Sequence, residues 1–161
     1  LSRKDIHLQL ILSENAFNPI GFQYVHRQIV AITAQYGIAR QVHVVRDFLP
    51  SLEILHRLWM SDVGFLYIEG ETLSSSAAIR YFVAARLPLV KTHTTHFDDV
   101  RGGAVTTDPS VFTFAHAILT LLDEQETRYR LHHEHKETYD NFVWPKFGEK
   151  YLEIYKRVLG G

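Results

Sequence analysis

Short apolar runs alternate with segments of helical periodicity along this chain, and this alternation constrains the fold more than any other feature. The runs have the length and near-continuous apolar character of strands buried on both faces. They are HLQLIL from His7 to Leu12, Val42 to Val45, Val63 to Ile68, LPLVKT from Leu87 to Thr92, and a short fifth, GGAVTTD. Alternation with short connections is typical of parallel strands joined by helical crossovers. We therefore predict an α/β domain built on a doubly wound parallel sheet, in three α/β/α layers.

The segments between these strands repeat apolar residues at helical spacing. The first extends from Val25 to Tyr36 and is followed by Gly37, at the position of a helix C-cap. A second begins at Pro50, with Ser51 as its expected N-cap. The residues expected on the inner faces of the later helices are Leu52, Leu55 and Trp59; Ile79, Phe82 and Val83; Val111, Phe114, Ile118 and Leu121; and Phe147, Tyr151, Ile154 and Val158.

No internal repeat, low-complexity segment or long linker divides the 161 residues, so we expect one domain over residues 1–161. A polar stretch, DEQETRYRLHHEHKETYDNF, is expected to form a solvated surface helix carrying His132, His133 and His135. A last helix, residues 144–158, begins at Trp144-Pro145, and we expect Trp59 and Trp144 to be packing residues. An exposed apolar face on this last helix would indicate a missing interface.

Composition excludes several classes of function. The chain has no cysteine, which leaves no disulfide, no thiol nucleophile and no thiolate metal site. That absence fits a reducing compartment, and we expect a cytoplasmic protein. A formal net charge of -1 argues against broad nucleic-acid binding. No apolar run approaches the roughly 20 residues of a membrane-spanning helix.

Three consecutive serines, Ser74 to Ser76, stand between the third strand and the next helix, just after Glu69 and Glu71. The first N–H groups of a helix lack internal partners, and the helix dipole makes that end partially positive. Serines there either cap the helix or bind an anion such as phosphate, and this stretch leaves both open. Ligands of such sheets bind outside the carboxyl ends of the strands, where this loop is expected. Neither GxGxxG nor GxxxxGK[ST] is present, so dinucleotide and P-loop sites are unsupported.

Six motifs, in order, resemble the C-terminal, nucleotide-sugar-binding half of retaining GT-B glycosyltransferases, family 4 in particular. In LHRLWMSDVGFLYIEGETLSSSAAIRYFVAARLPLVKTHTTHFDDV, Ser61-Asp62-Val63 opens a strand, an acidic loop follows, and Ser74 to Ser76 begin a helix. ARLPLVKT matches the family's next strand. The flanking matches are YGIARQVHVVRDFLPSLEILHRLW upstream, and DPSVFTFAHAILTLLDEQETRYRL and FVWPKFGEKYLEIYKRVL downstream.

The resemblance implies a Rossmann-like domain that binds a nucleotide-diphosphate sugar for retaining hexosyl transfer, in polysaccharide or glycoconjugate biosynthesis. It implies no cofactor and no metal, and it assigns no catalytic residue. The expected partners are the nucleotide sugar and an acceptor-binding N-terminal GT-B domain, with peripheral membrane association of the intact protein left open. The implied contacts are Ser74, Ser75 and Ser76 for the diphosphate; Glu69, Glu71 and Thr72 for the donor sugar; and Arg46, Lys91 and Asn15 for the nucleotide.

Several positions depart from the family pattern. Members commonly carry two glutamates separated by seven residues, but the matching positions here are Leu73 and Tyr81, and a usual glycine is Arg86. The basic residues that usually neutralise the diphosphate precede the first strand and have no convincing match. We therefore expect the isolated chain to be inactive. The departures favour an alternative function, a non-catalytic GT-B-like module acting in protein interaction or scaffolding.

The stretch KTHTTHFDD follows the fourth strand and contains His93, His96, Asp98 and Asp99. A histidine spacing of three would suit metal binding on a helix, but this stretch is expected to be a loop. We expect a polar loop, either on the donor side of the sheet or simply solvated, and no metal site.

Overall fold

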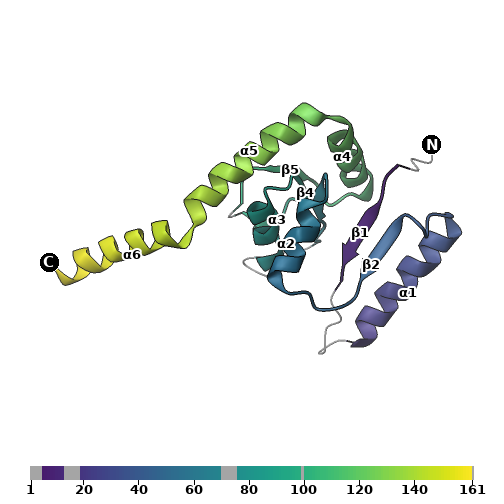
Figure 1. Ribbon diagram of the computed structural model, residues 1–161, viewed down its shortest axis with the longest axis horizontal. Coiled ribbons are helices and arrows are strands. Elements are labelled where there is room, and N and C mark those ends of the chain that lie inside the picture. Colours follow the sequence, from purple (N-terminus) through teal and green to yellow (C-terminus); the bar gives the residue numbers. More distant parts are fainter. Residues whose placement is uncertain (1–4, 13–18, 70–75, 99, 161) are drawn as a thin grey trace. The chain divides into compact units, whose positions relative to one another are not determined.

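The computed structural model of the chain describes residues 5–12, 19–69, 76–98 and 100–160. Its contacts group into two compact units, Leu1–Pro50 and Ser51–Gly161, and each is described by itself. Figure 1 shows both units and labels most of their helices and strands. The single domain over residues 1–161 stays a prediction.

The first unit is a pair of parallel strands connected through a helix. The strands β1 (Leu8–Ile11) and β2 (Val42–Val45) pair with Leu8 opposite Val42, and α1 (Pro19–Gln35) lies between them in the sequence. Helix α1 ends at Gln35, and Gly37, two residues later, has a φ of 66°. The Ile38 amide bonds to the Thr33 carbonyl at 2.9 Å and the Gly37 amide to the Ala34 carbonyl at 3.1 Å, the pattern of a Schellman cap. The C-cap predicted at Gly37 is confirmed.

The second unit is built on a parallel sheet of three strands in the order β3-β4-β5. Leu89 of β4 lies opposite Gly64 on one side and Ala104 on the other, so both ladders are in register. The parallel α/β organisation predicted from the alternating runs is confirmed. In chain order the elements are α2 (Ser51–Trp59), β3 (Gly64–Leu66), α3 (Ala77–Ala85), β4 (Leu89–Thr92), the short 3-10 helix η1 (Thr95–Phe97), β5 (Ala104–Thr107), α4 (Val111–Asp123), α5 (Gln125–Phe142) and α6 (Trp144–Leu159).

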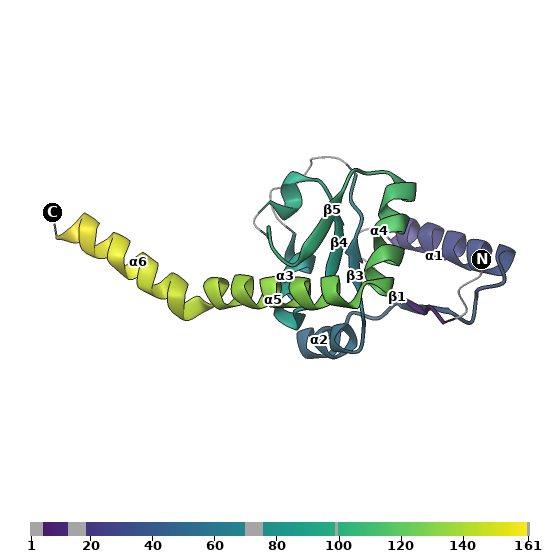
Figure 2. The ribbon, with the colours of Figure 1, turned by 90° about the horizontal axis from the view of Figure 1, so that it is seen from above.

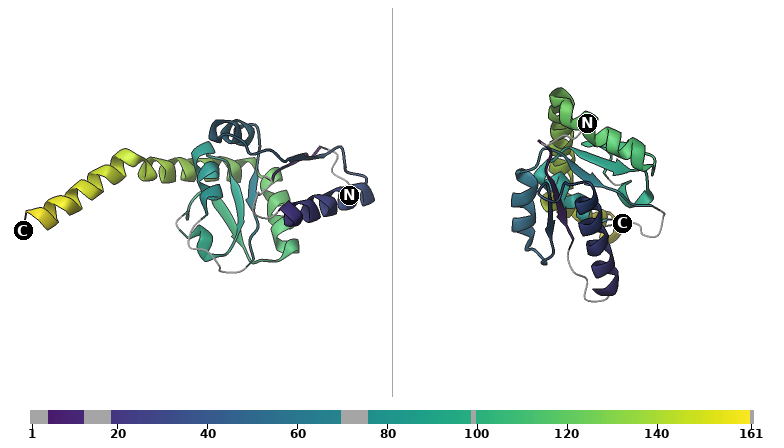
Figure 3. Two further views of the ribbon diagram at one scale, coloured as in Figure 1. Left: turned by 90° about the horizontal axis from the view of Figure 1, so that it is seen from below. Right: turned by 90° about the vertical axis from the view of Figure 1, so that its right-hand side faces the viewer.

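Alternate residues of the three strands pack on opposite faces of the sheet, because successive side chains of a strand point to opposite sides. One face carries the core of Leu66, Leu89, Ala104, Ile79, Val83, Phe97 and Val100, built with α3 and η1. The other carries Phe65, Val90, Val105, Phe114, Leu121 and Leu131, built with α4 and α5. Helices therefore cover both faces of β3–β5, and the predicted three layers are confirmed in this unit (Figures 2 and 3).

Helix α2 turns inward a face that only partly matches the prediction, which is confirmed for Leu55. Ile54, Leu55 and Leu58 pack against α3. Leu52 and Trp59 are 60% and 56% exposed, so their predicted inward position is wrong. Helical spacing fits both faces equally well, and contact with α3 decides between them. Ser51 is the first residue of the helix, and its Oγ lies 2.9 Å from the Tyr81 hydroxyl.

Helix α5 is less solvated than its composition predicted. His133 is exposed, but His135 is fully buried and Leu131, four residues earlier, is 1% exposed. The Nδ1 atom of His132 lies 2.9 Å from the Arg86 carbonyl oxygen. The predicted solvated position is therefore wrong for His135, because residues four apart form a narrow inward stripe on an otherwise polar helix.

Helix α6 leaves an apolar face exposed. Tyr151, Ile154 and Val158, three of the residues predicted on that face, are 54%, 53% and 72% exposed. Together with its last-turn residues Lys156 and Arg157, the helix is amphipathic. Across the described part of the chain, no helix combines the length and apolar content needed to cross a bilayer.

Candidate functional site

The carboxyl ends of β3, β4 and β5 meet at one edge of the parallel sheet. Three connections leave this edge: the segment after β3 that leads to α3, the segment around η1, and the segment of residues 108–110 before α4. This is the edge at which open parallel sheets bind their ligands. Four of the predicted site residues lie outside the described residues in the second unit, namely Glu71, Thr72, Ser74 and Ser75, and Asn15 does so in the first.

Ser76 occupies the N-cap position of α3. Its backbone is extended, with φ of -113° and ψ of 120°, yet its side chain makes no capping hydrogen bond. The next two residues, Ala77 and Ala78, are small and exposed. The amino end of α3 therefore begins at the ligand edge of the sheet, and its described residues Ser76, Ala77 and Ala78 give it little side-chain cover. This arrangement favours an anion through the amide groups and the helix dipole.

Glu69 stands on the same edge, directly after β3. Its side chain is exposed at the surface, and the Tyr67 hydroxyl donates a hydrogen bond to Oε1 over 2.6 Å. The Tyr67 oxygen is also 3.1 Å from the Pro109 carbonyl oxygen, in the segment before α4. The hydrogen bond to Glu69 raises the pKa of Tyr67 above its usual 10.0, because the neutral phenol is the donor.

Thr92 holds the main chain between Tyr67 and Glu69. Its Oγ1 donates to the Ile68 carbonyl at 2.8 Å and lies 3.0 Å from the Ile68 amide nitrogen, which donates to it. Thr92 is fully buried at the end of β4. The Thr92 hydroxyl thus extends the pairing of β3 with β4 beyond its last backbone pair, Leu66 and Lys91. It fixes the position at which the segment after β3 begins.

Lys91 was predicted to contact the nucleotide, and the structure places its ammonium inside the unit. The residue is 6% exposed. Nζ donates to the carbonyl oxygens of Phe97 and Val100 at 3.0 and 2.9 Å. A buried ammonium requires such acceptors, so Lys91 shapes the segment around η1. Its contact with a nucleotide stays a prediction.

Arg46 belongs to the first unit and follows β2. Its guanidinium carbon lies 5.4 Å above the centre of the Phe22 ring, a cation–π arrangement. Val44, Val45, Arg46 and Asp47 line an open hollow of about 440 Å³. Arg46, which was predicted to contact the nucleotide, therefore places a cation beside a hollow at the carboxyl end of β2.

The segment around η1 is less polar than predicted. His96 is 2% exposed and packs near Phe97, with 6.3 Å between ring centres. A solvated position, one of the two alternatives expected for this stretch, is thus wrong for His96, which the 3-10 turn directs into the core. Among the described residues, no three histidine, aspartate or glutamate side chains gather in a way that could hold a metal ion.

Sequence reasoning missed Tyr67 and Thr92. Both lie inside runs interpreted as strands, where an apolar or β-branched residue is ordinary. The available signal was their position, since each stands at or just past the carboxyl end of its strand. A polar group there is at the ligand edge of the sheet.

Comparison with known proteins establishes the fold. No protein-family model and no curated protein matches the sequence. Among solved structures, a glycosyltransferase from Rickettsia africae ESF-5 matches with a TM-score of 0.73 and 14% identity, over 96% of this chain and 40% of that one. Sucrose-phosphate synthase from Thermosynechococcus elongatus matches with a TM-score of 0.72 and 15% identity, over 96% of this chain and 39% of that one.

A UDP-forming α,α-trehalose-phosphate synthase from Burkholderia xenovorans matches with a TM-score of 0.67 and 14% identity, over 82% of this chain and 32% of that one. The chain thus spans two fifths or less of the length of these structures. Taken with the parallel sheet and its helices, the likeness shows that the chain has the α/β fold of one part of a GT-B glycosyltransferase, consistent with the C-terminal half that the sequence resembles.

Proposed function

We propose that this chain is the donor-binding half of a retaining GT-B glycosyltransferase of the family 4 kind, and that it binds a nucleotide-diphosphate sugar. The observation that carries the proposal is the amino end of α3. It begins at the ligand edge of the sheet, with the Ser76 side chain making no cap and with exposed alanines behind it. Partially positive amide groups in that position suit a diphosphate.

Each part of the donor has candidate contacts. Ser74, Ser75 and Ser76 are proposed for the diphosphate, and Glu69, Glu71 and Thr72 for the hydroxyl groups of the sugar. Arg46, Lys91 and Asn15 are proposed for the nucleotide. A nucleoside diphosphate as leaving group is supported by the resemblance and by the likeness to a synthase named as UDP-forming.

The complete enzyme is proposed to add an acceptor-binding domain. The exposed apolar face of α6 supports an interface with such a domain, because apolar side chains gathered on a surface favour burial. The isolated chain is proposed to bind a donor without turning it over. A helix dipole supplies only about 0.3–2 kcal/mol toward the charge of the leaving diphosphate. Enzymatic transfer asks for roughly 8 kcal/mol or more.

Calorimetric titration of the chain with UDP, GDP and ADP, and with UDP-glucose, GDP-mannose and ADP-glucose, tests the proposal. We expect at least one nucleotide to bind with millimolar or tighter affinity. Ser76→Asp should weaken that affinity roughly tenfold or more, because a carboxylate at the N-cap repels the diphosphate while still suiting the helix.

Ser61→Asp is the matched control. Ser61 lies just before β3, at the opposite end of the strand, where its hydroxyl donates to the Arg57 carbonyl. The same added charge there should change affinity less than twofold. Failure of all six compounds to bind would contradict the proposal and favour the interaction or scaffolding module instead.

A further inference from the structure

The Tyr67 side chain is held at both ends. Its ring meets the Phe114 ring of α4 edge-on, with centres 5.0 Å apart and an interplanar angle of 85°. Phe114 is 7% exposed and belongs to the core on that face of the sheet. The ring is therefore anchored while the hydroxyl lies at the ligand edge, beside Glu69 and Pro109.

The main chain beside Tyr67 is fixed as well. The Thr92 hydroxyl bonds both the amide and the carbonyl of Ile68, the residue between Tyr67 and Glu69. An exposed glutamate side chain ordinarily samples many rotamers, and ordering it costs free energy at the moment of binding. Here the backbone before Glu69 and one of its carboxylate oxygens are both held in advance.

The Glu69 carboxylate keeps capacity for a ligand. An ionised carboxyl group has two oxygens and about four acceptor sites, and among the described residues Tyr67 uses one site on Oε1. The remaining sites suit hydroxyl groups, which are neutral donors spaced along a sugar ring. The Tyr67 hydroxyl has two acceptors within reach, and the shorter contact, 2.6 Å, is with Glu69, while the Pro109 carbonyl lies at 3.1 Å.

We infer that Tyr67 is a positioning residue for the donor sugar: it holds the Glu69 carboxylate at the ligand edge, ready to accept hydrogen bonds from sugar hydroxyls. The inference rests on the proposed function, since it concerns the sugar part of the same site. It assigns to Tyr67 no contact with the diphosphate or the base.

The experiment compares each nucleotide sugar with its nucleotide by calorimetry, using UDP-glucose with UDP, GDP-mannose with GDP and ADP-glucose with ADP. For the pair that the wild-type chain binds, Tyr67→Phe should weaken the nucleotide sugar roughly three- to tenfold, the worth of one modest hydrogen bond. Affinity for the nucleotide alone should change less than twofold. A purely structural role would weaken both ligands together.

Two further variants sharpen the test. In a Glu69→Ala background, Tyr67→Phe should cause no additional loss of sugar affinity, because the positioned acceptor is already gone. Tyr129→Phe is the matched control, since Tyr129 is an exposed residue of α5 whose hydroxyl oxygen accepts a hydrogen bond from Gln125 at 3.2 Å. That variant should leave both affinities unchanged.

The outcomes separate the two proposals. A chain that binds a nucleotide and its sugar, but whose sugar affinity is unaffected by Tyr67→Phe, overturns the role of Tyr67 and leaves the donor site standing. Equal losses for nucleotide and nucleotide sugar also overturn that role. A chain that binds none of the six compounds overturns the donor site itself, and the role of Tyr67 with it.

Discussion

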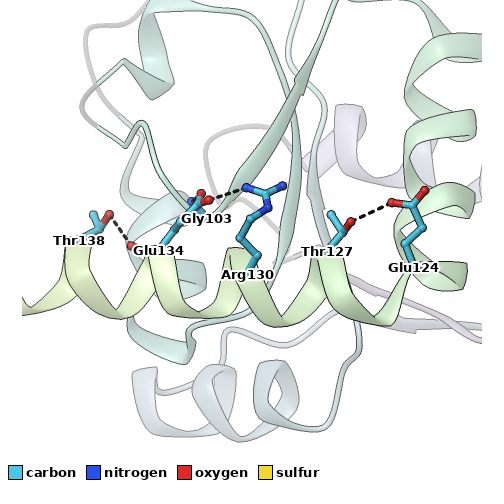
Figure 4. A network of polar contacts seen from close by, with 6 residues as sticks. All are labelled: Gly103, Glu124, Thr127, Arg130, Glu134 and Thr138. Atoms are coloured by element: carbon cyan, nitrogen blue, oxygen red, sulfur yellow. Dashed lines mark hydrogen bonds and ion pairs between the residues drawn. The ribbon is translucent and has the colours of Figure 1, made fainter.

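Gly103 lies against the imidazole ring of His135 so closely that a Cβ atom added to the glycine would overlap the ring. The same glycine has a φ of 77°, a conformation that side chains disfavour. Its amide donates to Glu134 at 2.9 Å, and Arg130 pairs with the same carboxylate (Figure 4). Gly103, just before β5, therefore contacts α5 through both the His135 ring and the Glu134 carboxylate.

Gly103→Ala should therefore lower the free energy of unfolding by roughly 3 kcal/mol or more, from backbone strain and steric overlap together. Gly37→Ala is the control, because Gly37 has a φ of 66° with no atom within 4 Å of an added Cβ. It should cost only about 1 kcal/mol. Urea denaturation of both variants measures the difference in the free energy of unfolding. Equal losses would show that the His135 ring moves aside for the added methyl group at little energetic cost.

The pH dependence of stability should report on His135. Burial lowers its pKa to about 4, against the opposing influence of the Leu87 main chain and Glu134. The unfolded chain, with an ordinary pKa of 6.5, takes up the proton first as pH falls, so stability is lost between pH 6.5 and 4. The expected loss from this one group between pH 7.5 and 5 is roughly 2 kcal/mol.

His135→Gln should remove about that much of the pH dependence, measured by denaturation at the two pH values. Glu134 affects stability at lower pH than His135 does. Its pKa is lowered, chiefly by the hydrogen bond from the Gly103 amide, so the stability that it contributes is lost only as pH falls below 4.5. The matched control is His133→Gln on the exposed side of α5, which retains His135 and should therefore keep the loss of stability that His135 causes between the two pH values. Identical profiles for the two variants would refute a buried, neutral His135.

Arg86 occupies a position that favours glycine. It follows α3 with a φ of 54°, and the amides of Arg86 and Leu87 bond back to the Val83 and Phe82 carbonyls. Arg86→Gly should raise the free energy of unfolding by about 1 kcal/mol, because glycine adopts this conformation without steric cost. The carbonyl that His132 contacts is retained. Arg86→Ala keeps the strained backbone and should give no such gain in thermal or urea denaturation.

The Thr92 hydroxyl satisfies two backbone groups of Ile68 at once. Thr92→Val keeps the shape of the side chain but leaves both groups without that partner, so it should lower the free energy of unfolding by roughly 2 kcal/mol or more. Thr92→Ser keeps the hydroxyl and loses one methyl group, a cost of about 1 kcal/mol. If serine proves more costly than valine, methyl packing outweighs the hydrogen bonds at this position.

Part of the site was accessible to sequence reasoning. The serines before α3 stand out because three small hydroxyl residues at a strand-to-helix junction are a local pattern, and Ser76 does take the N-cap position. The role of Tyr67 was not accessible, since its partners Pro109 and Phe114 are more than forty residues away in the chain. The hydrogen bonds of Lys91 were not accessible for the same reason, because its two acceptors depend on how the segment around η1 folds back.

The order of strands and helices, the parallel pairing and the glycine cap after α1 could all be predicted from the amino-acid sequence. These follow from apolar periodicity and backbone preference, which act over a few neighbouring residues. Which faces are buried depends on the packing of the folded chain, which places Leu58 inward rather than Trp59 and buries His135 on an otherwise polar helix. Burial depends on which element packs against a face, and residues distant in the chain supply that element, so local spacing carries too little information to choose it.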